Sequence, residues 1–424
     1  MVDADQTFVI VGGGLTGAKA AETLRAEGYS GRVILIGDER DHPYERPSLS
    51  KDYLLGKAER DSLFVHPPGW YAQHDVELHL GQTVESIDRE AGTVRLGDGT
   101  SIAYDKLLLA TGAEPRRLDV PGTHLVGVHH LRRLAHSERL RQVLTNLGRE
   151  NGHLVIAGAG WIGLEVAAAA RSYGAEVTVV HRGPTPLHGV LGPELGQLFT
   201  DLHREHGVRF HFGATLTEIV GQDGMVLAAR TDDGEEHPAH DVLAAIGAAP
   251  RTALAQAAGL ELVDPAEGGG VAVDAALRTS DPDVYAAGDI ASVHHPLFDR
   301  RIRVEHWANA LNGGPAAARA MLGREVAYDR LPYFYSDQYD VGLEYSGWAP
   351  PGSYDQVVIR GDAGKREFIA FWLAGGRVLA GMNVNVWDVT APVQDLIRSA
   401  APVDTEALAD PSVPLESLVT APVE

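Results

Sequence analysis

The chain has 424 residues, among them 48 glycines, 23 prolines and no cysteine, and it carries a formal charge of -22 at pH 7. The lack of cysteine excludes disulfides, thiolate nucleophiles and cysteine-ligated zinc or iron–sulfur centres, so any redox chemistry requires a bound cofactor. The negative charge argues against nucleic acid or an anionic membrane as the main partner, and no apolar run approaches the ~20 residues of a membrane-spanning helix. Because the N-terminus has no signal-peptide pattern, we expect a cytoplasmic globular protein of roughly two to four domains.

Two segments of the sequence repeat one pattern. Residues 8–28 and 154–174 each hold a short apolar strand, then G-x-G-x-x-G, then an alanine-rich helical stretch, and a second apolar strand follows each copy. The glycines of the two copies are Gly12, Gly14, Gly17, Gly158, Gly160 and Gly163. In this context the glycines permit a tight turn, a close approach of pyrophosphate and close helix packing, and the helix N-terminus offers free N–H groups. Two copies predict two dinucleotides, a resident flavin and a diffusing nicotinamide.

Further strand ends carry candidate binding residues. Segments 107–112, 241–250 and 279–289 are predicted to be buried strands that end in small-residue turns. Asp289 follows a glycine at such an end, where its carboxylate can accept hydrogen bonds from a sugar-like chain. Asp38 lies about 20 residues after Gly17 at the end of the second strand, which suits it to bind the adenosine ribose. The adjacent Glu39 could take that role instead.

Several longer motifs occur in a recognisable order. They are PYERPSLSK at 43–51, GAGWIGLEVA at 158–167, AAGD at 286–289, EHWANAL at 305–311 and YFYSDQYD at 333–340. In these motifs the chain resembles the FAD-dependent pyridine nucleotide-disulfide oxidoreductases, and within them the ferredoxin reductases of bacterial oxygenase systems. The resemblance implies an α/β fold with two Rossmann-like dinucleotide-binding domains and an α+β C-terminal domain. The FAD domain would comprise 1–115 and 246–326, the NAD(P)H domain 116–245, and the C-terminal domain 327–424.

The resemblance also implies site residues. It favours Asp38 over Glu39 and places Thr16, Asp38, Arg46, Lys51, Val84, Arg132, Asp289 and Trp307 at the FAD site. Lys51 and Glu165 are the implied catalytic pair beside the flavin, where the lysine charge would stabilise the anion formed as hydride arrives and the glutamate would orient the lysine. Ile162 and Gly247 are the implied additional contacts of the nicotinamide cofactor. Tyr335 stands where the family often has tryptophan.

The second strand of the nicotinamide domain, 177–180, indicates which nicotinamide is used. NAD-selective relatives end this strand in an acid that binds the ribose 2′-hydroxyl. Here the strand is followed by His181 and Arg182. An arginine binds a 2′-phosphate with charge-assisted hydrogen bonds, so we predict a preference for NADPH, with dual use as the alternative.

The 19 histidines show no metal-binding spacing, so no metal is predicted. His203 and His206 lie in a charged helical stretch and are expected to be solvated, while His294 and His295 are expected in a loop. The last segment, 402–424, holds five acids and no base and is expected to form a short helix or a solvated tail.

The implied function is electron transfer from NAD(P)H through non-covalent FAD to an iron–sulfur ferredoxin. That ferredoxin would feed a haem-thiolate monooxygenase or a Rieske dioxygenase. Arg300, Arg301 and Arg303 form a local basic cluster that we expect to dock it. A cysteine-independent NAD(P)H oxidase and a flavin-bound redox sensor resembling apoptosis-inducing factor are the alternatives. A monomer or a weak homodimer is expected.

Overall fold

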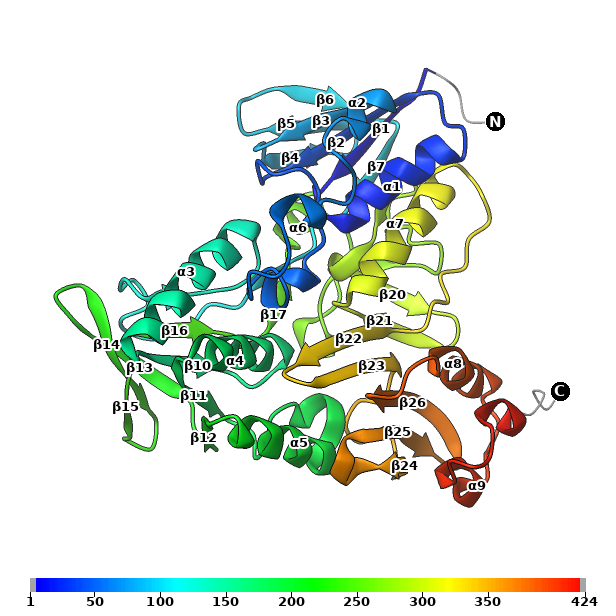
Figure 1. The fold of residues 1–424 in the computed structure, drawn as a ribbon. Coiled ribbons are helices and arrows are strands. Elements are labelled where there is room, and N and C mark those ends of the chain that lie inside the picture. The colour runs from blue at the N-terminus through cyan, green and yellow to red at the C-terminus, as the bar shows by residue number, and fades with distance from the viewer. Residues whose placement is uncertain (1–4, 420–424) are drawn as a thin grey trace. The chain divides into compact units, whose positions relative to one another are not determined.

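The computed structural model describes residues 5–419 and divides them into two compact units, each built from three stretches of chain. The first unit contains the residues up to Glu45, Glu59–Glu114 and Ala248–Pro332. The second contains Arg46–Ala58, Pro115–Gly247 and the residues from Tyr333 onward. Helices and strands alternate in both units (Figure 1), so the predicted α/β class is confirmed.

A five-stranded parallel sheet forms the centre of the first unit. Its strands, in the order β19-β7-β1-β2-β3, are Val284–Ala286, Lys106–Leu109, Thr7–Val11, Arg32–Gly37 and Val76–Leu80. Strands β1, β2, β7 and β19 are almost wholly buried and rich in Val, Ile and Leu, as expected for parallel strands covered on both faces. The predicted strands 8–11, 33–36 and 107–109 therefore lie side by side.

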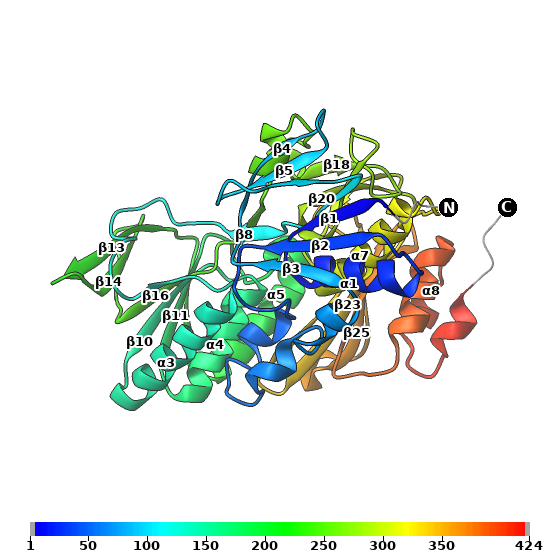
Figure 2. The same ribbon diagram turned by 90° about the horizontal axis from the view of Figure 1, so that it is seen from above.

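Two helices pack closely in this unit. Helix α1 (Leu15–Ala26) connects β1 to β2, and α7 (Trp307–Met321) lies beside it, as both Figure 1 and Figure 2 show. A Cβ atom built on Gly314 of α7 would lie 2.2 Å from the carbonyl oxygen of Thr16. Glycine is therefore required where the two helices approach most closely.

Smaller elements complete the first unit. They are the sheet β4 (Val84–Asp88), β5 (Thr93–Leu96) and β6 (Ser101–Ala103); the sheet β18 (Val271–Val273), β20 (Ala291–His295) and β21 (Arg300–Arg303); the pair β8 (Ala113–Pro115) and β17 (Ala248–Pro250); and the short helices η2 (Arg60–Leu63), α2 (Trp70–Gln73), α6 (Ala253–Ala257), η3 (Pro265–Glu267) and η4 (Gly288–Ile290). The predicted loop position of His294 and His295 is wrong, because both lie at the end of β20. Alternation along the strand leaves His294 exposed and His295 buried.

A second parallel sheet lies in the second unit. Its strands, in the order β12-β11-β10-β16-β9, are Val208–Phe212, Glu176–His181, His153–Ala157, Asp241–Ala244 and Val128–His129. It is accompanied by η1 (Pro47–Ser50), by the helices α3 (Leu134–Glu150), α4 (Trp161–Tyr173) and α5 (His188–Glu205), and by the sheet β13 (Leu216–Gln222), β14 (Met225–Thr231) and β15 (Glu236–Pro238). Ala157 pairs with Val180 here as Val11 pairs with Ile36 in the first unit, so the sequence repeat is also a structural repeat.

An antiparallel sheet forms the C-terminal part of the second unit. Its strands, in the order β22-β23-β26-β25-β24, are Tyr333–Gln338, Val341–Gly347, Arg377–Val384, Glu367–Ala374 and Gln356–Asp362. Phe368, Phe371 and Trp372 of β25 are fully buried in it. The sheet is followed by α8 (Thr390–Ser399), α9 (Thr405–Ala409) and η6 (Leu415–Leu418), and another short turn, η5 (Ala363–Lys365), joins β24 to β25.

The acidic segment is folded as far as residue 419. Asp404 caps α9 by accepting from the backbone N–H groups of Glu406 and Ala407, and the side chains of Leu408 and Leu415 are buried. Of the two alternatives predicted for 402–424, the short helix is therefore the one found for 402–419. Residues 420–424 lie outside the described part of the chain. Among residues 5–419, no helix has both the length and the apolar character needed to cross a bilayer.

Candidate active site

The glycine-rich turn of the first unit has the features of a pyrophosphate site. Gly12 has a φ of +132°, and a Cβ atom there would lie 2.0 Å from the carbonyl oxygen of Ala110. A Cβ atom on Gly17 would lie 2.1 Å from the carbonyl oxygen of Gly12, whereas one on Gly14 would meet no neighbouring atom within 4 Å. Gly14 is the N-cap of α1 and supplies no side-chain cap. The open approach and the free N–H groups therefore fit an anionic diphosphate.

The segments that carry two predicted FAD-site residues meet beside this turn. Thr16 is buried in the first turn of α1, and a Cβ atom on Gly288 would lie 2.5 Å from its Oγ1. Asp289 follows Gly288 in η4. The AAGD motif therefore abuts the start of α1, next to the glycine-rich turn.

The other residues implied in the first unit take separate positions. Asp38, just after β2, has its Oδ2 3.2 Å from Nη2 of Arg251. The alternative residue Glu39 accepts a hydrogen bond from Tyr44 Oη at 2.6 Å. Val84 begins β4 and is buried. Trp307 begins α7, and its Nε1 donates to Glu45 at 2.9 Å.

His306 was missed by the sequence reasoning, although the quoted motif EHWANAL contains it. It is the residue before α7, next to Trp307. Burial lowers the pKa of His306 to about 4, and the nearby Asp289 only partly opposes this. The imidazole is therefore neutral near pH 7. The sequence shows its position beside Trp307 but holds no signal of its burial.

The second glycine-rich turn repeats the first. A Cβ atom on Gly158, whose φ is +104°, would lie 2.3 Å from the carbonyl oxygen of Ala245, and one on Gly163 would lie 2.3 Å from that of Gly158. Gly160 again meets no neighbour within 4 Å and again begins its helix without a side-chain cap. Ile162 is exposed in the first turn of α4, and Gly247 lies two residues beyond Ala245. These residues fit a second dinucleotide.

The end of β11 carries the residues predicted to select the nicotinamide. His181 is the last residue of β11, and its Nδ1 accepts from the backbone N–H of Ala159 in the glycine-rich turn at 3.4 Å. Burial, with Arg182 and His188 adding to it, lowers the pKa of His181, so this ring is neutral near pH 7. Arg182 is exposed. By strand register it stands where Asp38 stands in the first unit.

Lys51 and Glu165 form an ion pair in the second unit. Lys51 follows η1, and its Nζ lies 2.8 Å from Oε1 of Glu165, which α4 buries. Ser336 donates to the same oxygen at 2.7 Å, and Ser50 donates to Oε2. Three donors thus offset the cost of burying the carboxylate.

The surroundings of this pair include both expected and unexpected residues. The ring centroid of Tyr335 lies 5.3 Å from Lys51 Nζ, so tyrosine retains the aromatic contact with the cation. Ser50 and Ser336 were not predicted, although both lie in quoted motifs. A serine in a motif gives no sign of where its hydroxyl points.

The residues implied at the FAD site are divided between the units. Arg46, Lys51 and Arg132 belong to the second unit, where Arg46 Nη1 donates to the carbonyl oxygen of Arg132. The remaining five belong to the first. Their shared role in FAD binding stays a prediction.

The prediction that His203 is solvated is wrong. Its side chain is fully buried, and its Nε2 lies 2.8 Å from Oε1 of Gln338 on β22. Burial lowers the pKa of His203 to about 4. His206 is half-buried and stacks on Tyr339, with ring centroids 3.6 Å apart. Helix α5 looks charged in sequence, but one of its faces packs on the C-terminal sheet.

One group among the described residues could hold a metal ion. The ligand atoms of His211, Glu235 and His237 lie within 4.8 Å of one another. His211 Nε2 already lies 2.7 Å from Oδ2 of Asp233, so this hydrogen bond gives the cluster a structural explanation. The expected absence of a metal stays a prediction.

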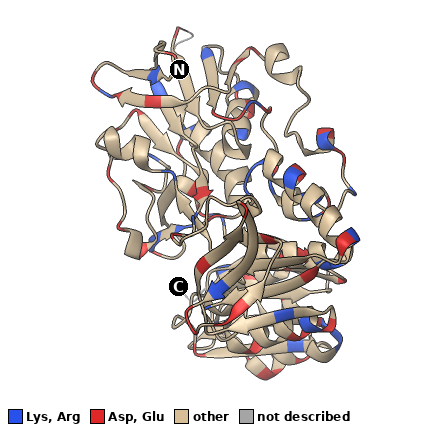
Figure 3. Cartoon of the chain, turned by 90° about the vertical axis from the view of Figure 1, so that its left-hand side faces the viewer, with Lys and Arg blue, Asp and Glu red and all other residues tan. Residues whose placement is uncertain are grey.

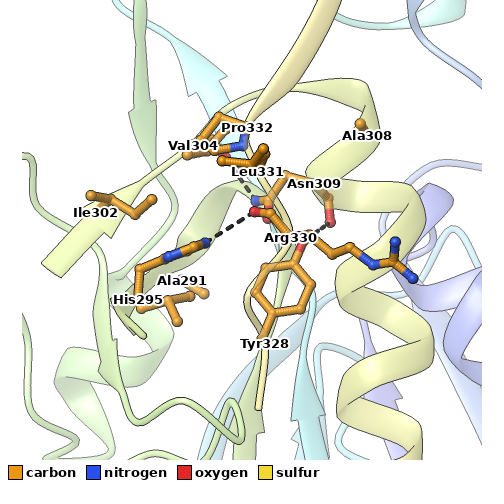
Figure 4. Close-up of a pocket in the computed structure, with 11 residues that line it drawn as sticks. Ala291, His295, Ile302, Val304, Ala308, Asn309, Tyr328, Arg330, Leu331 and Pro332 are labelled. Atoms are coloured by element: carbon orange, nitrogen blue, oxygen red, sulfur yellow. Dashed lines mark hydrogen bonds between the residues drawn. The ribbon is translucent and has the colours of Figure 1, made fainter. Parts of the chain in front are cut away.

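A small cavity in the first unit lies near the start of α7 (Figure 4). Its volume is about 20 Å³, which suffices for one water molecule and not for a cofactor. His295 Nε2 donates to the carbonyl oxygen of Arg330 at 3.0 Å, and Tyr328 donates to Asn309 Oδ1 at 2.8 Å. These bonds hold 328–330 against β20 and α7.

The three arginines predicted to dock ferredoxin lie on β21. Arg301 Nη1 donates to the carbonyl oxygens of Val273 and Ser292, both at 2.9 Å, and Arg303 Nε donates to that of Gly268 at 2.6 Å. Arg300 is exposed. Acidic and basic residues are scattered over the chain in Figure 3, so basic residues also occur outside this cluster. The docking role stays a prediction.

Comparisons with known proteins agree with this architecture. Residues 6–314 match the family described as pyridine nucleotide-disulphide oxidoreductase, and residues 333–419 match the reductase C-terminal domain. The anthranilate 1,2-dioxygenase system ferredoxin–NAD(+) reductase component of Burkholderia cepacia is 39% identical over 413 residues, covering 97% of this chain and 99% of that protein. Putidaredoxin reductase of Pseudomonas putida is 36% identical over 422 residues, covering 99% of this chain and 98% of that protein.

Comparison with solved structures also finds ferredoxin reductases. The ferredoxin reductase for the CYP199A2 system from Rhodopseudomonas palustris superposes with a TM-score of 0.92 at 37% identity and covers 98% of this chain and 100% of that one. The reductase in its covalent complex with putidaredoxin gives 0.91 at 36% identity, with 98% and 99% covered. The family implies FAD and NAD(P)H as cofactors. The chain therefore belongs to the pyridine nucleotide-disulphide oxidoreductases, in the branch of oxidoreductases that contains the ferredoxin reductases.

Proposed function

We propose that this chain is a reductase that passes electrons from NAD(P)H through non-covalent FAD to an iron–sulfur ferredoxin. The ferredoxin in turn feeds an oxygenase, either a haem-thiolate monooxygenase or a Rieske dioxygenase. The observation that carries the proposal is the pair of glycine-rich turns, one in each unit. Each is followed by a helix that begins without a side-chain cap, on a chain without cysteine. Relatives named as reductases of dioxygenase systems and of putidaredoxin support it.

In this proposal each part of the chain has one task. Residues 1–115 and 246–326 bind FAD, residues 116–245 bind the nicotinamide, and residues 327–424 form the C-terminal domain. When bound, FAD supplies hydride acceptance and single-electron release. The N–H groups at the start of α1 and of α4 bind the two pyrophosphates, Asp38 binds the adenosine ribose of FAD, and Lys51 holds a positive charge that Glu165 orients.

FAD is expected to be bound tightly but without a covalent bond, because the chain has no cysteine for a thioether link and a histidine-linked flavin is not part of the family pattern. The purified protein is expected to be yellow. After acid precipitation the colour should appear in the supernatant, where its absorbance spectrum identifies the flavin. Colour that remains in the pellet would show a covalent link and contradict this prediction.

Cytochrome c reduction tests the whole proposal. With NAD(P)H in excess, adding a ferredoxin from the same source is expected to raise the rate at least about tenfold, because the ferredoxin carries electrons one at a time to the haem. An oxidase would consume NAD(P)H and oxygen at the same rate with and without ferredoxin. A redox sensor would turn over slowly and change its assembly on reduction. Either result would contradict the proposed function.

We further propose that NADPH is the preferred nicotinamide. Support comes from Arg182, which is exposed and occupies the register position of the ribose-binding acid. The names of several relatives specify NAD(+), so this selectivity would distinguish the chain from them.

A further inference from the structure

A continuous row of hydrogen bonds leads away from Glu165 through the second unit. Ser336 Oγ donates to Glu165 Oε1 at 2.7 Å, and Gln338 Nε2 donates to Ser336 Oγ at 3.1 Å. His203 Nε2 lies 2.8 Å from Gln338 Oε1, and Tyr339 Oη lies 3.2 Å from His203 Nδ1. Glu165, Ser336, Gln338 and His203 are all at least nine-tenths buried. The row therefore has no access to water along most of its length.

The direction of every hydrogen bond in this row is fixed. The carboxylate of Glu165 can only accept, so the single hydroxyl hydrogen of Ser336 must point to it. Ser336 must then accept from the amide nitrogen of Gln338, which turns the amide oxygen toward His203. Reversing that amide would leave Ser336 facing two acceptors with one hydrogen.

His203 completes the same pattern. Its pKa is lowered to about 4 by burial, with His206 adding to the effect, so the ring carries one hydrogen near pH 7. That hydrogen must lie on Nε2, because Nε2 faces the amide oxygen of Gln338. Nδ1 is then free to accept from Tyr339. Every hydrogen in the row thus points toward Glu165, an arrangement in which neighbouring bonds strengthen one another.

The local backbone conformation places these side chains in the row. Ser336 and Gln338 are two residues apart on β22, so their side chains lie on one face of the strand. Tyr339 follows with a φ of +58°, an uncommon conformation for a residue other than glycine. Its ring contacts those of His203 and His206. A tyrosine is thus held in a left-handed conformation at the position that ends the row.

We propose that Ser336, Gln338 and His203 are positioning residues that keep the carboxylate of Glu165 aligned on Lys51. The proposal rests on the proposed function, since the charge on Lys51 matters for electron transfer only beside a flavin. If the row is broken, the Ser336 hydroxyl is free to turn away and the carboxylate loses a donor. The carboxylate then loses its alignment on Lys51, and the ammonium group is no longer held at the position where its charge favours the reduced flavin.

Gln338→Leu is the direct test, and the chain offers a matched control. Gln394 also donates to a buried serine, Ser346, at 3.1 Å in the same unit, but that bond has no connection to Glu165. Gln338→Leu is expected to slow the limiting rate of flavin reduction by excess NADPH or NADH roughly tenfold, with the dissociation constant of the nicotinamide changed by less than about twofold. Gln394→Leu is expected to leave both unchanged.

The midpoint potential of the bound flavin gives a second readout. Photochemical reduction measures it without nicotinamide or ferredoxin, and Gln338→Leu is expected to make it more negative, while Gln394→Leu is not. His203→Gln keeps an N–H donor where the imidazole has one, so its limiting rate and midpoint potential are expected to equal those of the wild type. His203→Leu removes that donor and is expected to lower the rate and make the potential more negative. Ser336→Ala replaces Gln338→Leu if the latter fails to fold.

Two results would overturn the proposal. One is a Gln338→Leu protein whose rate and potential equal those of Gln394→Leu. The other is an equal fall of the limiting rate and of the midpoint potential in His203→Gln and in His203→Leu. A wild-type protein that reduces no ferredoxin would overturn the proposed function alone, since the potential and the flavin reduction rate are measured without ferredoxin.

Discussion

Lys51→Met is expected to slow the limiting rate of flavin reduction by nicotinamide about a hundredfold, the cost typical of losing one group that stabilises developing charge. Methionine keeps the length of the side chain and removes the charge. The nicotinamide dissociation constant should change far less, because the charge helps most as hydride arrives. Stopped-flow reduction over a range of nicotinamide concentrations measures both quantities.

The controls separate chemistry from folding. Lys57 is exposed in the same stretch of the second unit, so Lys57→Met changes the net charge equally and is expected to leave the limiting rate unchanged. Lys51→Met also leaves Glu165 buried without its cation, so the melting temperature should fall, and rates must be compared at a temperature where both variants are folded. An unchanged limiting rate in Lys51→Met would remove this residue from the mechanism.

The sequence was most informative where backbone constraints are local. Both glycine turns could be predicted because Gly12 and Gly158 have no room for a side chain, and because the same pattern occurs twice with the same following strand. The short apolar runs that follow, 33–36 and 177–180, pair in the same register in both units. Local sequence determines such strand–turn–helix units, so one chain suffices to identify them.

Apart from the Lys51–Glu165 pair, which the family resemblance implied, side-chain contacts between distant segments could not be predicted. His203 lies in a helix whose charged neighbours suggest a solvated face, but its partner Gln338 is 135 residues away. Ser50 and Ser336 both donate to Glu165, and nothing in either segment shows that α4 will lie between them. Their burial depends on how the C-terminal sheet packs on α4 and α5. The division into two units was likewise not apparent, because 46–58 joins the second unit while both its flanks belong to the first.

NADPH is expected to be used with a specificity constant about tenfold above that of NADH, since one arginine–phosphate contact contributes roughly 1.5–3 kcal/mol and 1.4 kcal/mol corresponds to a factor of ten. Arg182 is exposed at the position where the first unit has Asp38. An acid there would repel a 2′-phosphate, while a guanidinium binds it with paired hydrogen bonds. His181 Nδ1 accepts from Ala159, so only its Nε2 is free to donate.

The contributions of the two residues can be separated. The pKa of His181 is lowered, so the ring is neutral at pH 7 and the charge that favours the phosphate comes from Arg182. Arg182→Ala alone is therefore expected to remove most of the preference, and adding His181→Glu should reverse it toward NADH. Arg149→Ala, at an exposed arginine of the same unit, should change neither specificity constant. A wild-type protein that strongly prefers NADH would mean that another residue supplies the acid, and that the strand end at His181 does not select the cofactor.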